Sequence, residues 1–362
     1  NWFTNVDFTI VGSGIVGLHC ALELREKFPS AKILVLEKGV LPQGASTKNA
    51  GFACFGSVSE ILDDLNSHTE EEVLQLVQKR WNGLQLLRKR VGDEALDLKP
   101  FGGYELFLKE DESTYEECLQ KLPFINELLK PLFKNDVFSK EVDRFAFNAI
   151  HEYVLFNPYE AQIDTGNMMQ KLLKLAVHQN ILILNQQTVS SFIEKNNVVE
   201  VVLDDFSFPT KKLFFATNGF AKELTNGEVK PARAQVLITK PIPNLDIRGT
   251  FHLDKGYYYF RNFENRILLG GGRNLDFEGE TTTDLAQTEI IQNKLEQLLK
   301  EVILPNQSFE IEHRWSGIMG VGNHKKPIVK QLSENVFCGV RLGGMGVAIG
   351  SLVGKELADL ID

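Results

Sequence analysis

The sequence predicts an α/β fold in which two domains are interleaved along the chain. A strand, glycine turn, helix and strand pattern occupies residues 7–37, aromatic-rich strand patterns fill the middle, and a second glycine-rich turn leads into a helix near the end. The chain has 362 residues, a length typical of two domains, and 43% of them are hydrophobic, which is enough for large buried cores. Elements of one domain lie at the start, middle and end of the chain, and this favours interleaving over two successive units.

The first pattern is the most informative one. The apolar run Asp7–Val11 ends in the motif Gly12–Gly17 (GSGIVG), and a helical pattern continues from there to about Phe28. A second apolar run, Lys32–Leu36, ends at Glu37. This order of strand, tight turn, helix, strand and acid is typical of a βαβ unit that binds a dinucleotide.

Each residue type in this unit has a physical role. Gly12 permits the tight turn, Gly14 lets a pyrophosphate approach the backbone, and Gly17 lets the helix pack close to the strand. Free amides at the helix N-terminus bind phosphate. The carboxylate of Glu37 accepts hydrogen bonds from ribose hydroxyls and would repel the 2′-phosphate of NADP.

Three further segments favour FAD over NAD. Gly44–Gly51 is a second loop of small and polar residues, Phe215–Gly219 is an apolar run that breaks at a glycine, and Gly339–Gly346 precedes a long apolar helix. The last of these would place a helix N-terminus beside the N1–C2=O edge of a flavin, where reduced flavin accumulates negative charge. Taken singly, the first and last segments could also be a helix cap and a strand-to-helix turn.

The remaining patterns complete the expected fold, an FAD-binding Rossmann-like domain interleaved with a mixed-sheet α+β substrate domain. Further helices are expected over residues 57–66, 70–92, 112–134, 162–179 and 284–302. Strands are expected over 104–108, 153–156, 181–184, 188–193, 198–203, 213–216, 234–239, 257–261, 266–270 and 309–315. We expect the FAD-binding domain to comprise residues 1–80, 155–230 and 325–362, and the substrate domain 81–154 and 231–324.

Composition narrows the function classes. The formal charge of −9 argues against a nucleic-acid surface. The four cysteines form no CxxC pair and the histidines show no ligand spacing, so no metal site is expected. No run of 18 apolar residues occurs, so no transmembrane segment is expected and the cytoplasm is the default location.

In this order, the motifs resemble the D-amino-acid-oxidase-type family of FAD-dependent oxidoreductases, which includes glycine oxidase, sarcosine oxidase and γ-glutamylputrescine oxidase. The resemblance covers nearly the whole chain. The segments that carry it are Gly12–Gly17 with Glu37, Ala45–Gly51, Asn157–Asp164, Ala216–Gly219, Pro231–Val236, Trp315–Pro327 and Gly339–Gly350.

The resemblance implies FAD as the cofactor and a set of contacts to it. Val189 is expected to meet the adenine through its backbone, and Ser46, Thr47 and Lys48 to run beside the pyrophosphate or flavin. The full set of expected FAD-binding residues is Gly12, Gly14, Ile15, Val16, Gly17, Glu37, Lys38, Ser46, Thr47, Lys48, Asn49, Ala50, Gly51, Val189, Thr217, Asn218, Gly219, Gly317, Gly339, Arg341, Gly343, Gly344, Met345 and Gly346.

Departures from the family pattern are equally informative. Family members that attach the flavin covalently use a cysteine in the Trp315–Pro327 region or a histidine where this chain has Lys48, so FAD is expected to be non-covalent. Met319 stands near the place of an arginine that binds the substrate carboxylate in glycine-oxidase-like members. Leu268 stands where sarcosine oxidase has a lysine that promotes the reaction with oxygen. The electron acceptor, oxygen or an external molecule, therefore stays open.

The reaction implied by the resemblance is oxidation of the C–N bond of a small amine or amino acid, with hydride transfer to flavin N5 and hydrolysis of the imine. The candidate catalytic residues are Tyr258, Arg341 and Lys48; alternatively, the tyrosine packs in the core and the arginine pairs on the surface. With Met319 at the turn, glycine and sarcosine are expected to be poor substrates unless Arg341 or Lys48 binds the carboxylate. Three rivals are an FAD-dependent 2-hydroxy-acid dehydrogenase, an NAD-dependent reductase and a binding protein that keeps FAD as a structural element.

Overall fold

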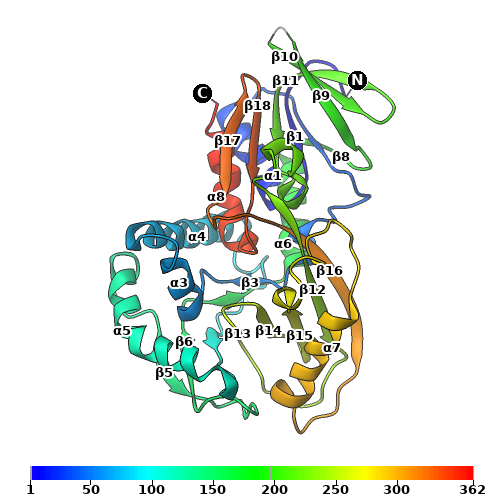
Figure 1. The fold of residues 1–362 in the computed structure, drawn as a ribbon. Helices are drawn as coiled ribbons and strands as arrows, with labels where there is room; N and C mark the ends of the chain where they lie inside the picture. Colours follow the sequence, from blue (N-terminus) through cyan, green and yellow to red (C-terminus); the bar gives the residue numbers. More distant parts are fainter. Residues whose placement is uncertain (1, 196, 362) are drawn as a thin grey trace.

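The computed structural model describes residues 2–195 and 197–361, which form two large sheets with helices around and between them (Figure 1). The first sheet has the order β17-β18-β11-β1-β2-β8, and the hairpin β9–β10 extends it through β11. Its strands are β1 (Val6–Val11), β2 (Ile33–Leu36), β8 (Leu182–Leu184), β9 (Val189–Lys195), β10 (Val198–Leu203), β11 (Ser207–Phe215), β17 (Ile328–Ser333) and β18 (Val336–Val340).

The centre of the first sheet is parallel and is covered by two packed helices. β1 pairs in parallel with both β2 and β11, so the carboxyl ends of these strands meet at one edge. The helices α1 (Ile15–Lys27) and α8 (Gly346–Ala358) pack against each other on this sheet. Gly354 of α8 permits this packing, because a Cβ there would lie 2.6 Å from the carbonyl oxygen of Val16 in α1. Gly17 lets α1 approach the turn after β1, because a Cβ there would lie 1.9 Å from the carbonyl oxygen of Gly12.

The second sheet has the order β16-β12-β15-β14-β13-β4-β6-β5 and is mixed, because β4 runs parallel to β13 while the other pairs are antiparallel. Two separate parts of the chain build it. Its strands are β4 (Gly103–Glu105), β5 (Ser139–Val142), β6 (Tyr153–Asn157), β12 (Lys230–Thr239), β13 (Thr250–Leu253), β14 (Tyr258–Phe263), β15 (Arg266–Gly271) and β16 (Ile311–Val321).

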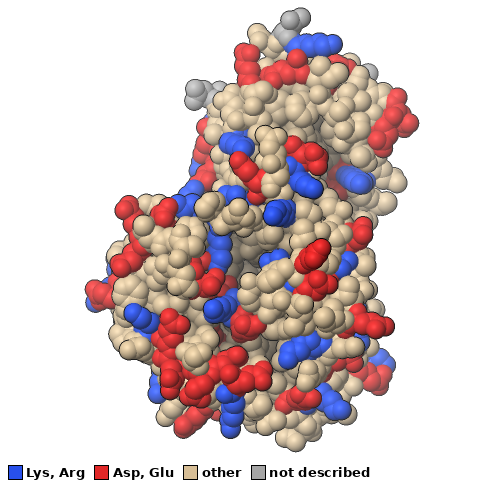
Figure 2. All heavy atoms as spheres, in the orientation of Figure 1, with Lys and Arg blue, Asp and Glu red and all other residues tan. Residues whose placement is uncertain are grey.

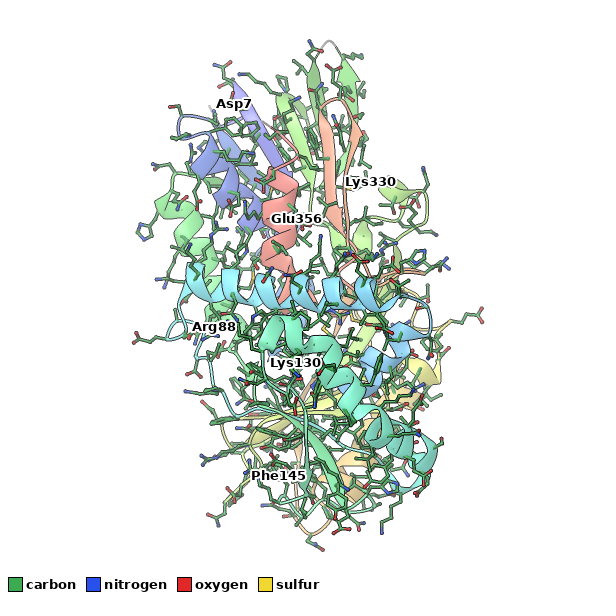
Figure 3. All side chains as sticks on the ribbon, turned by 90° about the vertical axis from the view of Figure 1, so that its left-hand side faces the viewer. Asp7, Arg88, Lys130, Phe145, Lys330 and Glu356 are labelled. Atoms are coloured by element: carbon green, nitrogen blue, oxygen red, sulfur yellow. The ribbon has the colours of Figure 1, made fainter. Side chains whose placement is uncertain are left out.

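The remaining elements connect and cover the two sheets. A long helix, α4, crosses the molecule between the first sheet and α5 (Figure 3), and a capping box of Thr69 and Glu72 fixes its start. The elements are α2 (Ala45–Lys48), α3 (Val58–Leu65), α4 (Glu70–Val91), α5 (Glu112–Phe133), α6 (Thr165–His178), α7 (Glu289–Leu298) and the short strands β3 (Phe52–Ala53) and β7 (Ala161–Gln162).

The structure confirms the expected α/β fold. Helices stand where the periodicity places them, with α5 continuing through Pro123 and Pro131. Several elements differ in length from the expectation: β11 begins at Ser207, β12 begins at Lys230, β4 ends at Glu105, β16 runs on to Val321, and α7 begins at Glu289 rather than near residue 284. Within residues 2–195 and 197–361, no helix is both long and apolar enough to cross a bilayer.

Candidate functional site

A cavity of about 1580 Å³ runs between the two sheets. Figure 2 shows the face that is hollowed there, with Lys and Arg side chains around the hollow. Glu37 and Val189 line the part next to the first sheet, while Tyr259 and His252 line the part next to the second. Pockets for drug-sized ligands typically measure about 300–1,000 Å³, so this cavity has room for a dinucleotide and a small substrate.

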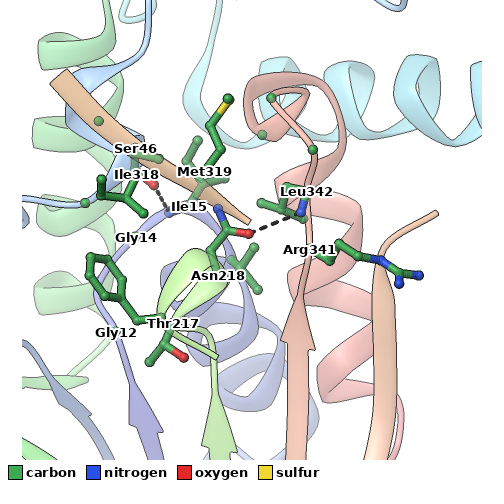
Figure 4. Close-up of a pocket in the computed structure, with 18 of the residues that line it drawn as sticks. Gly12, Gly14, Ile15, Ser46, Thr217, Asn218, Ile318, Met319, Arg341 and Leu342 are labelled. Carbon is green, nitrogen blue, oxygen red and sulfur yellow. Dashed lines mark hydrogen bonds between the residues drawn. The ribbon is translucent and has the colours of Figure 1, made fainter. Parts of the chain in front are cut away.

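The glycine turn after β1 forms the cradle that a pyrophosphate needs. A Cβ at Gly14 would lie 2.8 Å from the hydroxyl oxygen of Ser46 and would fill the space between the turn and α2. The N–H of Ile15, at the start of α1, donates to that hydroxyl at 2.9 Å (Figure 4). The first helix and the Gly44–Gly51 loop thus meet at the cavity wall, with the positive end of the helix dipole directed into it.

The carboxylate of Glu37 is held in place at the end of β2. Its Oε2 accepts hydrogen bonds from the hydroxyl of Ser13 at 2.6 Å and from the N–H of Ser13 at 3.2 Å. Its Oε1 accepts from the N–H of Gly39 at 2.9 Å. An acid fixed in this orientation, and lining the cavity, fits the ribose of a bound dinucleotide.

The turn before α8 forms another wall of the cavity. Gly343 and Gly344 have positive φ angles of 56° and 85°, and the N–H of Leu342 donates to Oδ1 of Asn218 at 3.1 Å (Figure 4). The turn thereby aims the first amides of α8 at the cavity, where Gly346 is one of the lining residues. Unpaired helix amides at this position fit a group that becomes negative on reduction.

Most of the residues expected to bind FAD are brought together around this cavity. Lining it are Gly12, Gly14, Ile15, Val16, Glu37, Lys38, Ser46, Lys48, Asn49, Ala50, Gly51, Val189, Thr217, Asn218, Gly317, Arg341, Gly343, Gly344, Met345 and Gly346.

Four residues of the expected set do not line the cavity, namely Gly17, Thr47, Gly219 and Gly339. The glycines make close packing possible behind the wall: a Cβ at Gly219 would lie 2.5 Å from the carbonyl oxygen of Met319, and one at Gly339 would lie 3.1 Å from Leu357. The hydroxyl of Thr47 donates to the carbonyl oxygens of Pro42 and Gly44 instead.

The strand register of the second sheet decides which tyrosines reach the cavity. Tyr259 stands opposite His252 on β13 and opposite Gly270 on β15, and it lines the cavity. Tyr258 points to the other face and packs in the core cluster that includes Ile291 of α7. The structure therefore places Tyr257 and Tyr259, but not Tyr258, at the cavity.

A buried histidine, His252, stands opposite Tyr259 on the neighbouring strand and is paired with the carboxylate of Glu160. Nε2 of His252 is 2.9 Å from Oε2 of Glu160, and its Nδ1 is 3.8 Å from Oε2 of Glu60. Burial opposes protonation of the imidazole, but the charge and hydrogen bond of Glu160, with Glu60 and Glu105 nearby, outweigh it and raise the pKa of His252 to about 9. His252 is therefore an imidazolium at neutral pH.

Sequence reasoning missed this pair, because no short motif joins two residues 92 positions apart. The ligand-type atoms of Cys54, Glu160 and His252 lie within 4.8 Å of one another. The His252–Glu160 hydrogen bond brings two of these three residues together.

The other two candidate catalytic residues line the cavity in different ways. The backbone carbonyl of Lys48 accepts a hydrogen bond from Nε1 of Trp315 at 2.9 Å, which ties α2 to β16. The side chain of Arg341 points away from Met319 in Figure 4, and its Nε donates to the carbonyl oxygen of Lys326 at 2.9 Å. Leu268 is buried in an apolar cluster with Val236.

Comparison with known proteins assigns the chain to a family. The family model described as "FAD dependent oxidoreductase" (DAO) matches residues 7–360. The "Probable oxidoreductase OrdL" of Haemophilus influenzae is 21% identical over 99% of this chain and 83% of its own length. The γ-glutamylputrescine oxidoreductase of Escherichia coli is 22% identical over 98% of this chain and 83% of its own length.

Solved structures share the fold at lower identity. Glycine oxidase from Geobacillus kaustophilus superposes with a TM-score of 0.77 at 17% identity, covering 98% of this chain and 94% of that one. L-proline dehydrogenase from P. horikoshii gives a TM-score of 0.75 at 19% identity, with coverages of 99% and 93%. The glycine cradle, the fixed acid and the α8 turn fit FAD, and the match of the family model over residues 7–360 shows that the chain belongs to the DAO family of FAD-dependent oxidoreductases.

Proposed function

We propose that this enzyme oxidises the C–N bond of a small amine or amino acid. Bound FAD supplies the hydride acceptor, and the substrate binds as the free base between the flavin and the face of the second sheet that carries Tyr259. Proteins of similar fold include a glycine oxidase, an L-proline dehydrogenase and an iminodiacetate oxidase, and their names support this substrate class.

The observation that carries the proposal is the buried pair of His252 and Glu160, whose 2.9 Å contact raises the pKa of the imidazole. Oxidation of an alcohol requires a base that takes the hydroxyl proton, whereas a neutral amine loses hydride from its α-carbon without one. Two histidines line the cavity. His324 is exposed, and His252 is kept protonated by Glu160, so neither is a buried neutral imidazole that could act as this base. This supports an amine over the 2-hydroxy acid of the alternative function.

The residues of the chain bind and orient the substrate and exclude water. Tyr259 is partly buried, and the desolvation of its phenol raises the pKa to about 12, so that it stays a neutral hydrogen-bond donor. Its ring packs against Phe52 with a centroid distance of 5.7 Å, which fixes the direction of the hydroxyl group. Positioning of this kind, together with the electrostatics of the flavin, accounts for much of the rate.

We further propose that FAD is bound non-covalently. Cys54 lines the cavity, but burial raises the pKa of its thiol well above the ordinary value, so that the unreactive thiol form persists. Acid precipitation of the yellow protein should leave the colour in the supernatant. Colour that stays with the pellet would show a covalent bond, and digestion of the pellet would identify the residue.

The division of the chain also stays a proposal: residues 1–80, 155–230 and 325–362 hold FAD, and residues 81–154 and 231–324 bind the substrate.

The electron acceptor is oxygen or an external molecule. Leu268 brings no charge to the place where sarcosine oxidase has its lysine, and this favours an external acceptor.

The test is anaerobic bleaching of the flavin in the purified holoenzyme by a panel of compounds. Primary and secondary amines, amino acids and 2-hydroxy acids are added in turn, and absorbance in the visible range is followed. We expect bleaching by amines or amino acids. Bleaching by a 2-hydroxy acid alone would establish the alternative function, and bleaching by none of them would contradict the proposal.

A further inference from the structure

Two arginines line the cavity: Arg341 donates to the carbonyl oxygen of Lys326, whereas the Arg273 side chain has no such partner among the described residues. Arg273 follows β15 and lines the cavity together with Tyr257, Thr283 and Leu285. Within residues 2–195 and 197–361, the Arg273 side chain forms neither an ion pair nor a hydrogen bond. Burial lowers the pKa of its guanidinium, although the group stays charged at neutral pH.

The Arg273 side chain is partly buried, so it loses part of its hydration and an anion that pairs with it is favoured. Another arginine of the same sheet shows what compensation looks like: Nε and Nη2 of Arg233 each lie 2.8 Å from an oxygen of Glu280. Glu280 is thereby engaged by Arg233, and Gln235 donates to it as well. The pairing potential of Arg273 is left for a molecule in the cavity.

The guanidinium of Arg273 is also held in a defined place. It lies 4.8 Å from the centre of the Phe277 ring, and Phe277 packs edge-on against Tyr257 at 5.9 Å. The next residue, Asn274, donates from Nδ2 to Oδ2 of Asp254 at 2.8 Å, which ties this short turn to the end of β13. A cation that is prearranged in this way binds an anion at a low entropic cost.

Its location differs from that of Met319. Met319 belongs to β16, while Arg273 follows β15, and β12 lies between these two strands. Neighbouring strands are about 4.8 Å apart, so the two backbones are separated by roughly 10 Å. An anion at Arg273 would be held at the side of the cavity formed by Tyr257 and the segment 273–285.

We propose that Arg273, with the Tyr257 hydroxyl beside it, binds the carboxylate of the substrate and so selects amino acids over simple amines. A guanidinium pairs with a carboxylate through two parallel hydrogen bonds, which a thioether such as that of Met319 cannot form. The proposal rests on the proposed function, since it assigns the substrate class of the same cavity.

The test uses the FAD-loaded enzyme and two probes of the same shape, benzoate and its neutral analogue benzamide. Both are titrated while the visible flavin spectrum is followed. The variants are Arg273→Gln and Arg273→Lys, with Arg248→Gln as the matched control, because Arg248 is exposed and does not line the cavity. The FAD content of each variant is measured to show that the cofactor site is intact.

We expect benzoate to bind the wild type about 10- to 100-fold more tightly than benzamide, as charge-assisted hydrogen bonds predict. Arg273→Gln should remove this difference by weakening benzoate alone, Arg273→Lys should keep part of it, and Arg248→Gln should keep all of it. Equal affinities in the wild type, or unchanged benzoate binding in Arg273→Gln, would overturn the proposal.

A second measurement separates this inference from the proposed function. Flavin bleaching is compared for L-proline against pyrrolidine and for glycine against methylamine, pairs that differ only in the carboxylate. Preference for an amino acid that is lost in Arg273→Gln supports both proposals. Bleaching by the amines with no effect of Arg273→Gln would overturn the carboxylate site alone. Arg273-dependent benzoate binding without bleaching by any of these compounds would overturn the proposed function alone.

Discussion

Nε2 of His252 lies 2.9 Å from Oε2 of Glu160, and both side chains are almost completely buried where His252 lines the cavity. The hydroxyl of Thr250 donates to the same oxygen at 2.9 Å. A buried ion pair of this kind makes folding depend on pH, because the charge of the histidine is stabilised only in the native state.

We predict that the free energy of unfolding falls between pH 6.5 and pH 9. The pKa of His252 is raised from 6.5 to about 9 on folding, so its contribution is fully present below pH 6.5 and is lost as the pH rises through 9. At about 1.4 kcal/mol per pH unit, the loss amounts to at most about 3 kcal/mol. Urea unfolding at several pH values measures it.

The control variants are His252→Gln and His178→Gln, the latter at an exposed histidine. The first should have a flatter dependence on pH over this range, and the second should follow the wild type. A fall that persists unchanged in His252→Gln would mean that another group causes it.

Glu37→Ala is predicted to weaken FAD binding by about 1–3 kcal/mol, because it removes a charge-assisted hydrogen bond to the ribose. The carboxylate is fixed by Ser13 and Gly39 at the cavity wall. The dissociation constant of FAD is measured by fluorescence on dilution. Glu278→Ala serves as the control, since Glu278 is exposed and outside the cavity; equal retention of FAD in both variants would show that the ribose is held by other groups.

Sulfite is predicted to add readily to the bound flavin, because the α8 turn directs helix amides at the place where negative charge develops. Asn218→Asp tests this. The Oδ1 of Asn218 holds the turn through Leu342, and aspartate keeps this acceptor while it adds a negative charge. The affinity for sulfite should fall on the order of 10-fold, the effect of a unit charge several ångströms away.

Asn306→Asp is the matched control for this variant, because it adds the same charge at an exposed residue that does not line the cavity. Its affinity for sulfite should equal that of the wild type. Weak sulfite binding in all three proteins would mean that α8 points elsewhere.

Local patterns single out residues that the structure gathers along one side of the cavity, where FAD is proposed to bind. The glycine turn, Ser46 and Glu37 are recognisable because each lies within a few residues of a strand end or helix start, and the structure brings them to one cavity. The family resemblance and the α/β fold are confirmed by the family match over residues 7–360 and by the two sheets.

The substrate side was harder to predict, for physical reasons. His252 lies on β13 and Glu160 lies in the loop between β6 and β7, 92 positions away in the sequence. Arg273 is informative only because no acid of the described chain pairs with it. Side chains of a strand alternate between its faces, so the choice between neighbouring tyrosines depends on the register with two other strands. Sequence reasoning therefore favoured Tyr258, which the structure packs in the core.

This alternation gives a prediction with an internal control. Tyr259→Phe should lower the rate constant of anaerobic flavin reduction by about 10- to 100-fold, because it removes a positioned hydrogen-bond donor from the cavity wall. Tyr258→Phe should change it less than about threefold, since that hydroxyl lies on the other face of β14. Gly270 lets the Tyr259 ring lie across β15, because a Cβ at this position would lie 2.8 Å from the Tyr259 hydroxyl. The ring cannot move away from the cavity without losing its contact with Phe52. Stopped-flow measurement of flavin reduction at several substrate concentrations separates substrate binding from the chemical step. Thermal unfolding of both variants shows whether either substitution disturbs the sheet. A large loss in Tyr258→Phe with normal Tyr259→Phe would restore Tyr258 as the catalytic candidate and would require a register of β14 different from the one described.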